Sequence, residues 1–315
     1  MDNLCHSLVG AALAESGLRQ RTRYATTALV LGANFPDIDV AAVLTEHGLG
    51  FRRGITHGIP GLIVLPFVLT AIILAWHAAF RRPEESNPIR PKQLVLLSAL
   101  AILTHPALDW MNTYGMRWLM PLDGRWFYAD SLFIIDPWLL AMLGAAWLGG
   151  RRARMIGSAE LRVRGERFAR KMFLMSVTYI GGMMLLTQVG RVVADRDLGG
   201  ERRGPGQLMV SPPFLESWRR YVTVDAGAGY RFGRIDWWPR PTLELDSAML
   251  PKQIELLDEL PRPVPLEDLL DWGRFIYAKE EGDLVHVDDA RYSRGGRSFA
   301  GVVVRRGEKG GGGRR

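Results

Sequence analysis

The chain has 315 residues and a formal net charge of +7, and this length predicts about two domains. Its one cysteine, Cys5, excludes an internal disulfide and a cysteine-rich zinc ribbon. Residues 1–190 hold 32 charged side chains, whereas residues 191–315 hold 41. This contrast excludes one uniform globular domain and predicts a membrane-embedded domain (1–190), a small soluble domain (191–304) and a disordered tail (305–315).

Six apolar stretches predict a polytopic α-helical membrane domain with five or six spans. The clearest stretch, 58–76, has 19 residues and no charge, and about 20 apolar residues cross a bilayer core. The first stretch, 4–18, is short, so it either spans the membrane or lies at its interface. A soluble α-helical core is the alternative, but residues 58–76 are too uniformly apolar for it. The remaining stretches are 25–44, 94–110, 132–149 and 172–190.

The basic residues predict how these spans are oriented, because Lys and Arg favour the cytoplasmic side of short loops. The connections 19–23, 80–93 and 150–171 hold 15 of them, whereas 45–57 and 112–131 hold 4. This alternation places the distal domain outside. Four arginines after the last span argue against it, although long translocated domains are less bound by the charge rule. They are Arg191, Arg196, Arg202 and Arg203.

Histidines and aspartates interrupt the apolar stretches, and the predicted topology places seven of them at the outer face. Charged groups at membrane depth are costly and usually face a functional cavity. A metal ion supplies the counter-charge that buried carboxylates need. Mixed nitrogen and oxygen ligands suit a divalent cation, zinc in preference and manganese as the alternative, or a two-metal centre. The predicted metal ligands are His6, Asp37, Asp39, His57, His105 and Asp109.

The first two motifs each have a second interpretation. In NFPDID (34–39), the proline breaks the helix, and the two aspartates either hold cations or form a turn. Beside His57, Arg52 and Arg53 either hold a phosphate or carboxylate or touch lipid headgroups.

The later motifs are equally open when taken singly. His105 and Asp109 are four residues apart and share one helix face, so both are ligands or Asp109 orients the His105 ring. Asp136 stands before Pro137, which suits an N-cap as well as a ligand or general base. His6 alone also fits a satisfied interfacial histidine.

These motifs occur in a fixed order: His6, NFPDID (34–39), RRGITH (52–57), HPALD (105–109) and FIIDP (133–137). The order resembles the YdjM-type family, described as membrane-bound, metal-dependent hydrolases of the bacterial inner membrane, with a LexA-binding member in its naming. The resemblance covers residues 1–150 well and extends loosely to SPPFLESWR (211–219). It implies an inner-membrane location and a metal site at these positions. Arg52 departs from the pattern, because many members have histidine there.

The pattern changes after residue 190 to short alternating runs that predict a small, mostly β domain. Residues 191–315 hold 21 basic and 20 acidic side chains, so no basic face for nucleic acid is expected. The expected elements are a hairpin of 221–224 and 230–235, short helices at 256–260 and 266–275, and a last strand at 299–304.

The combined hypothesis is a metal-dependent hydrolase at the outer face of the membrane. It would act on a phosphoester or ester of a membrane lipid or lipid-linked substrate. Asp136 and Arg53 are the predicted catalytic residues, with Arg53 stabilising developing negative charge. The alternative is a non-enzymatic membrane regulator, transporter-like module or envelope assembly protein in which the polar residues form a structural network. A cytoplasmic partner role for the basic loop 150–171 is weaker, because such loops usually contact lipid.

Overall fold

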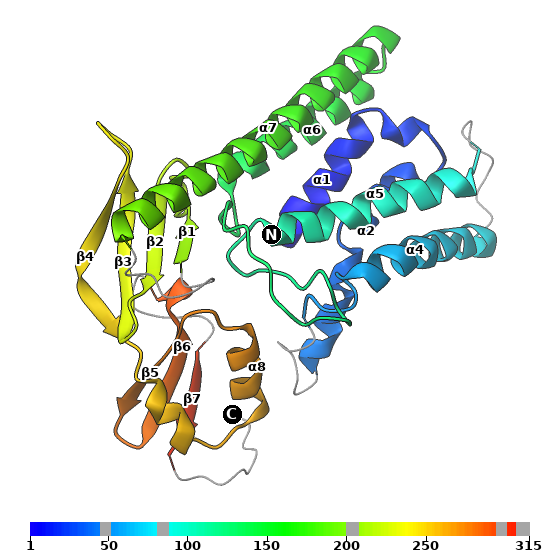
Figure 1. Ribbon diagram of the computed structural model, residues 1–315. Helices are drawn as coiled ribbons and strands as arrows, with labels where there is room; N and C mark the ends of the chain where they lie inside the picture. Colours follow the sequence, from blue (N-terminus) through cyan, green and yellow to red (C-terminus); the bar gives the residue numbers. More distant parts are fainter. Residues whose placement is uncertain (45–51, 81–87, 200–207, 294–300, 307–315) are drawn as a thin grey trace. The chain divides into compact units, whose positions relative to one another are not determined.

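The computed structural model describes residues 1–44, 52–80, 88–199, 208–293 and 301–306. The chain divides into two compact units, one made of residues 1–39 and 53–185 and the other of residues 40–52 and 186–315. The long helix α7 (Ala159–Leu198) contributes to both units (Figure 1). The predicted boundary after residue 190 therefore falls within a continuous helix. From residue 307 onward, the predicted disordered tail lies outside the described residues.

The first unit is helical. Helix α1 packs on α2, α5 and α6, and α4 packs on α5. At Gly10 of α1, a Cβ atom would lie 2.4 Å from the carbonyl oxygen of Leu29 in α2. A small residue at this point allows close helix contact, as is common in membrane proteins. The elements are α1 (Asn3–Glu15), the 3₁₀ helix η1 (Leu18–Gln20), α2 (Ala25–Gly32), the 3₁₀ helix η2 (Phe35–Leu44), α4 (Ile59–Phe80), α5 (Pro91–Trp110) and α6 (Pro137–Ile156).

Among the described residues, α4, α5 and α7 are the three helices long and apolar enough to cross a membrane. Helices α1 and α2 have 13 and 8 residues, fewer than the about 20 that a bilayer core requires. Helix α6 has 20 residues but carries three arginines near its end. The helical membrane part is confirmed, whereas the predicted number of five or six spans is not.

The surface of α4 is that of a helix surrounded by lipid. Ile63 and Phe67 are 61% and 60% exposed, although residues of these types are mostly buried in water-soluble proteins. In the most apolar segment of α7, 11% of the residues are buried inside the structure. The long helices therefore turn apolar side chains outward, which lipid tolerates and water does not.

The predicted stretch 25–44 is not one helix. Helix α2 ends at Gly32, and η2 begins at Phe35, next to Pro36. Proline removes a backbone donor and clashes with the preceding turn, so the predicted break occurs here. The chain changes direction at this break, and the aspartates that follow it face the helical core.

The second unit contains two antiparallel sheets. In the larger sheet the strand order is β1-β2-β3-β4, and in the smaller it is β5-β6-β7 (Figure 1). Strands β2 and β3 form the predicted hairpin, with Tyr221 opposite Arg234. The elements are β1 (Leu208–Ser211), β2 (Arg220–Asp225), β3 (Gly229–Asp236), β4 (Thr242–Pro251), η3 (Ile254–Glu259), α8 (Val264–Trp272), β5 (Ile276–Glu281), β6 (Leu284–Asp289), η4 (Ala290–Tyr292) and β7 (Val302–Arg305).

The end of α7 supplies part of the core of this unit. Val193 and Ala194 pack with Val210, Val222 and Ile235 of the larger sheet. The helix expected at 266–275 is observed as α8, which ends at Trp272 before Gly273. The segment expected at 256–260 is a 3₁₀ helix. The mostly β character predicted from the short alternating runs is thus observed.

Candidate metal centre

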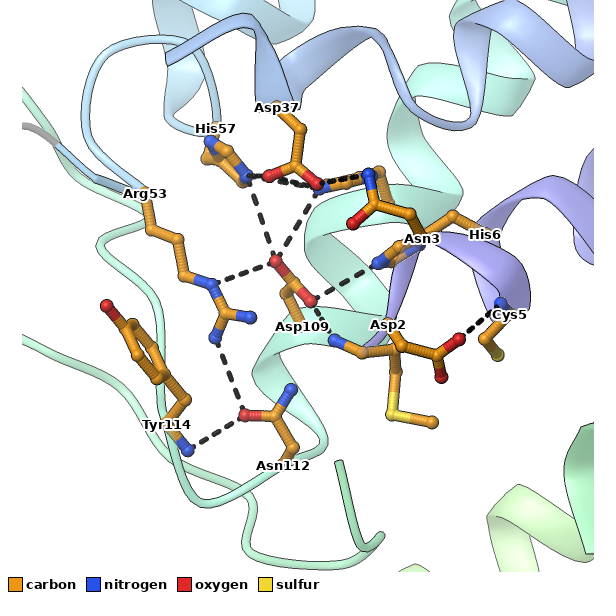
Figure 2. A network of polar contacts seen from close by, with 12 residues as sticks. Asp2, Asn3, Cys5, His6, Asp37, Arg53, His57, Asp109, Asn112 and Tyr114 are labelled. Carbon is orange, nitrogen blue, oxygen red and sulfur yellow. Dashed lines mark hydrogen bonds and ion pairs between the residues drawn. The ribbon is translucent and has the colours of Figure 1, made fainter. Parts of the chain in front are cut away.

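Four elements of the first unit bring the predicted ligands together (Figure 2). His57 precedes α4 by two residues, and Asp109 is the penultimate residue of α5. Because α4 and α5 pack side by side, the beginning of one meets the end of the other. Helix α1 adds His6, and η2 adds Asp37. The cluster therefore lies at one end of two membrane helices, where the polar residues were expected to converge.

The imidazole of His105 lies at the centre of the cluster. Its Nε2 atom lies 3.1 Å from Nε2 of His57, 3.6 Å from Oδ1 of Asp37 and 3.5 Å from Oδ2 of Asp109. Nε2 of His57 lies 3.7 Å from each of the same two oxygen atoms. Tetrahedral bonds of about 2.1 Å to zinc place ligand atoms about 3.4 Å apart. Five of the six separations among these four atoms lie near this value, and Asp37 and Asp109 belong to two separate groups of three that share His105.

Both histidines turn their Nε2 atom toward this centre. The Nδ1 atom of His105 lies 2.7 Å from the carbonyl oxygen of Ala33, and Nδ1 of His57 lies 3.3 Å from a carboxylate oxygen of Asp39. These oxygens only accept hydrogen bonds, and the hydroxyl of Thr56 also lies 3.0 Å from Nδ1 of His57. With a proton on each Nδ1, the two Nε2 lone pairs would face each other 3.1 Å apart, and a cation between them would bind both.

The electrostatics of His57 agree with this arrangement. Burial lowers its pKa below the ordinary value, and the hydrogen bond with Asp39 offsets part of that shift. A neutral imidazole is the form that binds a metal ion. The site is therefore prepared to accept a cation without first losing a proton from this ring.

His6 completes the histidine group. Its ring stacks on that of His105, with the ring centroids 3.8 Å apart, and its Nε2 atom lies 3.4 Å from Oδ1 of Asp109. The side chain is fully buried, and neither ring nitrogen makes a hydrogen bond within the described part of the chain. Buried polar atoms are normally satisfied, so His6 fits a further ligand position shared with Asp109.

Arg53 points into the same cluster. Its Nε donates to Oδ2 of Asp109 at 3.0 Å, and its guanidinium lies 4.2 Å from the centre of the Tyr114 ring. Another guanidinium nitrogen donates to the carbonyl oxygen of Gly115 at 2.7 Å. Oδ1 of Asp109 also accepts from the amino group of Met1. A buried carboxylate is thus surrounded by positive charge and histidines.

Asp39 lies behind His57 and contacts the far side of its ring. Its Oδ2 atom accepts from the backbone nitrogen of Arg53 at 2.8 Å and from the hydroxyl of Thr56 at 3.3 Å. These contacts, with Nδ1 of His57, are those of a residue that orients a ligand. Although Asp39 was predicted as a ligand, its described contacts favour this orienting role.

Asp136, a predicted catalytic residue, caps α6. Its Oδ1 atom accepts from the backbone nitrogens of Trp138 and Leu139 at 3.1 and 2.9 Å, and its Oδ2 accepts from the hydroxyl of Tyr179 at 2.8 Å. These contacts favour the N-cap interpretation.

An Asp39→Asn variant is expected to weaken metal affinity about 10–100-fold, the usual cost of losing a partner that orients a ligand. The change keeps the size of the side chain but removes the charge that holds the His57 ring. Competition with a fluorescent chelator measures the affinity. Asp136→Asn, the same change at the helix cap, is the matched control and should leave the affinity unchanged. Equal metal affinities for Asp39→Asn and the parent protein would contradict the orienting role of Asp39.

Other polar groups of the site were not identified from the sequence. Asn3 donates to Oδ2 of Asp37 at 3.2 Å. Asn112 accepts from the backbone nitrogen of Tyr114 at 2.8 Å and faces Arg53 (Figure 2). The position of Asn3, one helical turn before His6, was the available signal, because residues three apart share a face. Asn112 lies in an irregular segment, for which spacing predicts no direction.

Comparison with known proteins places the chain among membrane proteins. A family model described as YdjM inner membrane protein matches residues 1–189. The uncharacterized protein YfhP of Bacillus subtilis (strain 168) is 26% identical over 129 residues, covering 39% of this chain and 37% of that protein. The chain thus matches little more than a third of this relative's length. No solved structure matches the chain significantly.

Proposed function

Because the chain belongs to the YdjM inner membrane protein family, we propose that it is a metal-dependent hydrolase that works at the surface of the membrane. The observation that supports this proposal is the close spacing of four candidate ligand atoms, from 3.1 to 3.7 Å in five of their six pairs. A cation between the two Nε2 atoms, which lie 3.1 Å apart, would bind both of their lone pairs. The named relative is itself uncharacterized, so the activity is inferred from the site.

Four residues would hold the cation: Asp37, His57, His105 and Asp109. Their two nitrogen and two oxygen atoms suit zinc, with manganese as the alternative. A bound divalent cation supplies a Lewis acid and activates water near neutral pH. His6, which stacks on His105 and approaches Asp109, is positioned for a second, neighbouring cation.

Arg53 would stabilise the negative charge that develops on an attacked ester. Its guanidinium is buried and held by four groups: Asp109, the Gly115 carbonyl, the Asn112 side chain and the Tyr114 ring. A donor fixed in this way needs no reorganisation during the reaction. Arginine also matches the planar, bidentate geometry of phosphate better than lysine does.

The depth of the site favours a lipid or a lipid-linked phosphoester or ester as substrate. His57 and Asp109 lie at adjoining ends of α4 and α5, and the ends of spanning helices lie at headgroup level. The arginine distribution favours a multi-pass topology with this end and the distal domain on the periplasmic side. Membrane lipids would then surround the site directly.

The test is hydrolysis by the full-length protein in lipid nanodiscs, loaded with zinc or manganese. The panel consists of phospholipids, a chromogenic phosphodiester and a chromogenic carboxylic ester. We expect metal-dependent cleavage of at least one of them. Arg53→Lys keeps the positive charge but loses the planar pair of N–H donors. This variant should retain the metal and lower kcat about 10²–10³-fold, as expected for loss of a preorganised donor.

Two results would contradict the proposal. Loaded protein that hydrolyses nothing in the panel would favour the non-enzymatic alternative, a membrane regulator, transporter-like or assembly protein. Protein that binds no divalent cation at all would reduce the cluster to a structural polar network. Metal analysis alongside each assay separates these two results.

A further inference from the structure

The connection between β1 and β2 exposes a group of large apolar side chains. We name residues 212–219 the aromatic loop. Phe214, Leu215 and Trp218 are 49%, 50% and 55% exposed. Single exposed apolar residues are ordinary, but a contiguous group marks an interaction surface. These three side chains occur within five consecutive residues, so the loop qualifies as such a group.

Both ends of the aromatic loop lie against one point of α7. A Cβ atom added to Gly190 would lie 3.0 Å from Cγ1 of Val210 and 3.7 Å from Cγ of Arg220. Val210 stands near the end of β1, and Arg220 begins β2. The loop therefore leaves and re-enters the sheet beside Gly190.

Gly190 is the point at which α7 stops being apolar. Residues 172–190 carry no charge, whereas Arg191, Asp195, Arg196 and Asp197 follow within seven residues. The change from uncharged to charged sequence marks the place where a spanning helix leaves the hydrocarbon region. The aromatic loop is thus attached at the level of the headgroups of the membrane that α7 crosses.

The loop is held in shape by hydrogen bonds to its backbone carbonyl groups. Arg220 is fully buried, and its guanidinium donates to the carbonyl oxygen of Ser217 and, at 2.8 Å, to that of Arg219. The indole nitrogen of Trp237 donates to the carbonyl oxygen of Trp218 at 3.0 Å. Backbone groups are satisfied inside the loop while its apolar side chains stay outside. Little conformational entropy remains to be lost when these side chains meet an apolar phase.

We propose that the aromatic loop inserts into the headgroup region of the bilayer and anchors the larger sheet to the membrane surface. Tryptophan prefers this depth because its apolar ring and its polar N–H are both accommodated there, and phenylalanine and leucine bury apolar surface at the same boundary. Arg219, which is half exposed and lies 3.4 Å from Glu216 of the same loop, stands beside them, and arginine suits lipid phosphates. This inference rests on α7 as a membrane helix and is independent of hydrolase activity.

The experiment places a fluorescent label at single cysteines of the full-length protein, after Cys5→Ala removes the native thiol. Phe214→Cys reports on the loop. Met249→Cys is the matched control, since Met249 is 46% exposed and pairs with Arg231 toward the opposite end of the sheet. Val177→Cys, on an exposed position of α7, is the reference for a lipid-facing site. Nanodiscs contain phosphatidylethanolamine and phosphatidylglycerol with a fraction of nitroxide-labelled lipid.

We expect headgroup nitroxide to quench the label at 214 at least about threefold more than the label at 249, as insertion at headgroup depth requires. Acyl-chain nitroxide should quench the label at 177. Equal quenching at 214 and 249 would overturn the proposal, as would strong quenching at 214 by aqueous iodide. Absence of quenching at 177 would overturn it too, by removing α7 from the bilayer. Unchanged thermal midpoints verify that the labelled variants are folded.

Discussion

Replacing His105 with alanine is expected to abolish metal binding by the purified protein. Nε2 of His105 lies 3.1 to 3.6 Å from atoms of His57, Asp37 and Asp109, a separation that allows them to share one ion. His105 also belongs to both groups of residues that could hold an ion, one with His6 and Asp109 and the other with Asp37 and His57. No other residue of the cluster is common to both groups. Its loss should therefore remove every complete ligand set, and elemental analysis of the protein in detergent measures the result.

The matched control for this variant is His77→Ala. His77 lies near the end of the membrane helix α4, and its Nδ1 atom lies 3.2 Å from the hydroxyl of Tyr24. It shares the residue type and the helical setting of His105. We expect His77→Ala to retain full metal content. Metal retained by His105→Ala at the parent's stoichiometry would refute the proposed centre.

Replacing Asp109 with asparagine is expected to destabilise the membrane domain by about 3–5 kcal/mol, the usual cost of removing one partner from a buried ion pair. The side chains of Asp109 and Arg53 are 2% and 6% exposed. Without the Asp109 carboxylate, the Arg53 guanidinium stays buried beside histidines and loses the negative charge that residue 109 supplied. The midpoint of thermal unfolding in detergent, compared with the parent protein, reports the loss.

Asp123→Asn is the control for this charge change. Asp123 pairs with Arg125 at 2.6 Å, but that arginine is 74% exposed. Exposed ion pairs contribute little to stability, so the midpoint should hardly move. The double variant Arg53→Met/Asp109→Asn should recover part of the loss, because it removes the stranded charge as well. An Asp109→Asn protein as stable as Asp123→Asn would mean that the Arg53 pair is energetically unimportant.

The sequence by itself was sufficient to single out the residues that form the polar cluster. Ionisable residues within or beside apolar stretches are costly in a membrane, so the pattern of hydrophobicity alone singles out His57, His105 and Asp109. The i, i+4 spacing of His105 and Asp109 set their common helix face. The alternation of basic loops then indicated that distant segments bring such residues to the same side. In the folded chain these three residues lie in direct contact.

Sequence spacing alone could not show which aspartate faces the cluster and which one orients a histidine. Asp37 and Asp39 are two residues apart in a 3₁₀ helix, yet Asp37 meets Nε2 of His57 while Asp39 holds Nδ1 of the same ring. Their roles depend on where the segment before α4 crosses η2. Asp136 is likewise an N-cap because it immediately precedes the first residue of α6.

What the sequence determined by itself was the partition into a helical membrane part and a mostly β part, together with the residue types of the proposed metal centre. Those properties depend on hydrophobicity and local spacing, which can be read directly from the sequence. What only the tertiary structure decided was which atoms meet and that α7 continues from one compact unit into the next. These outcomes depend on packing between segments far apart in sequence, and no local pattern carries that information.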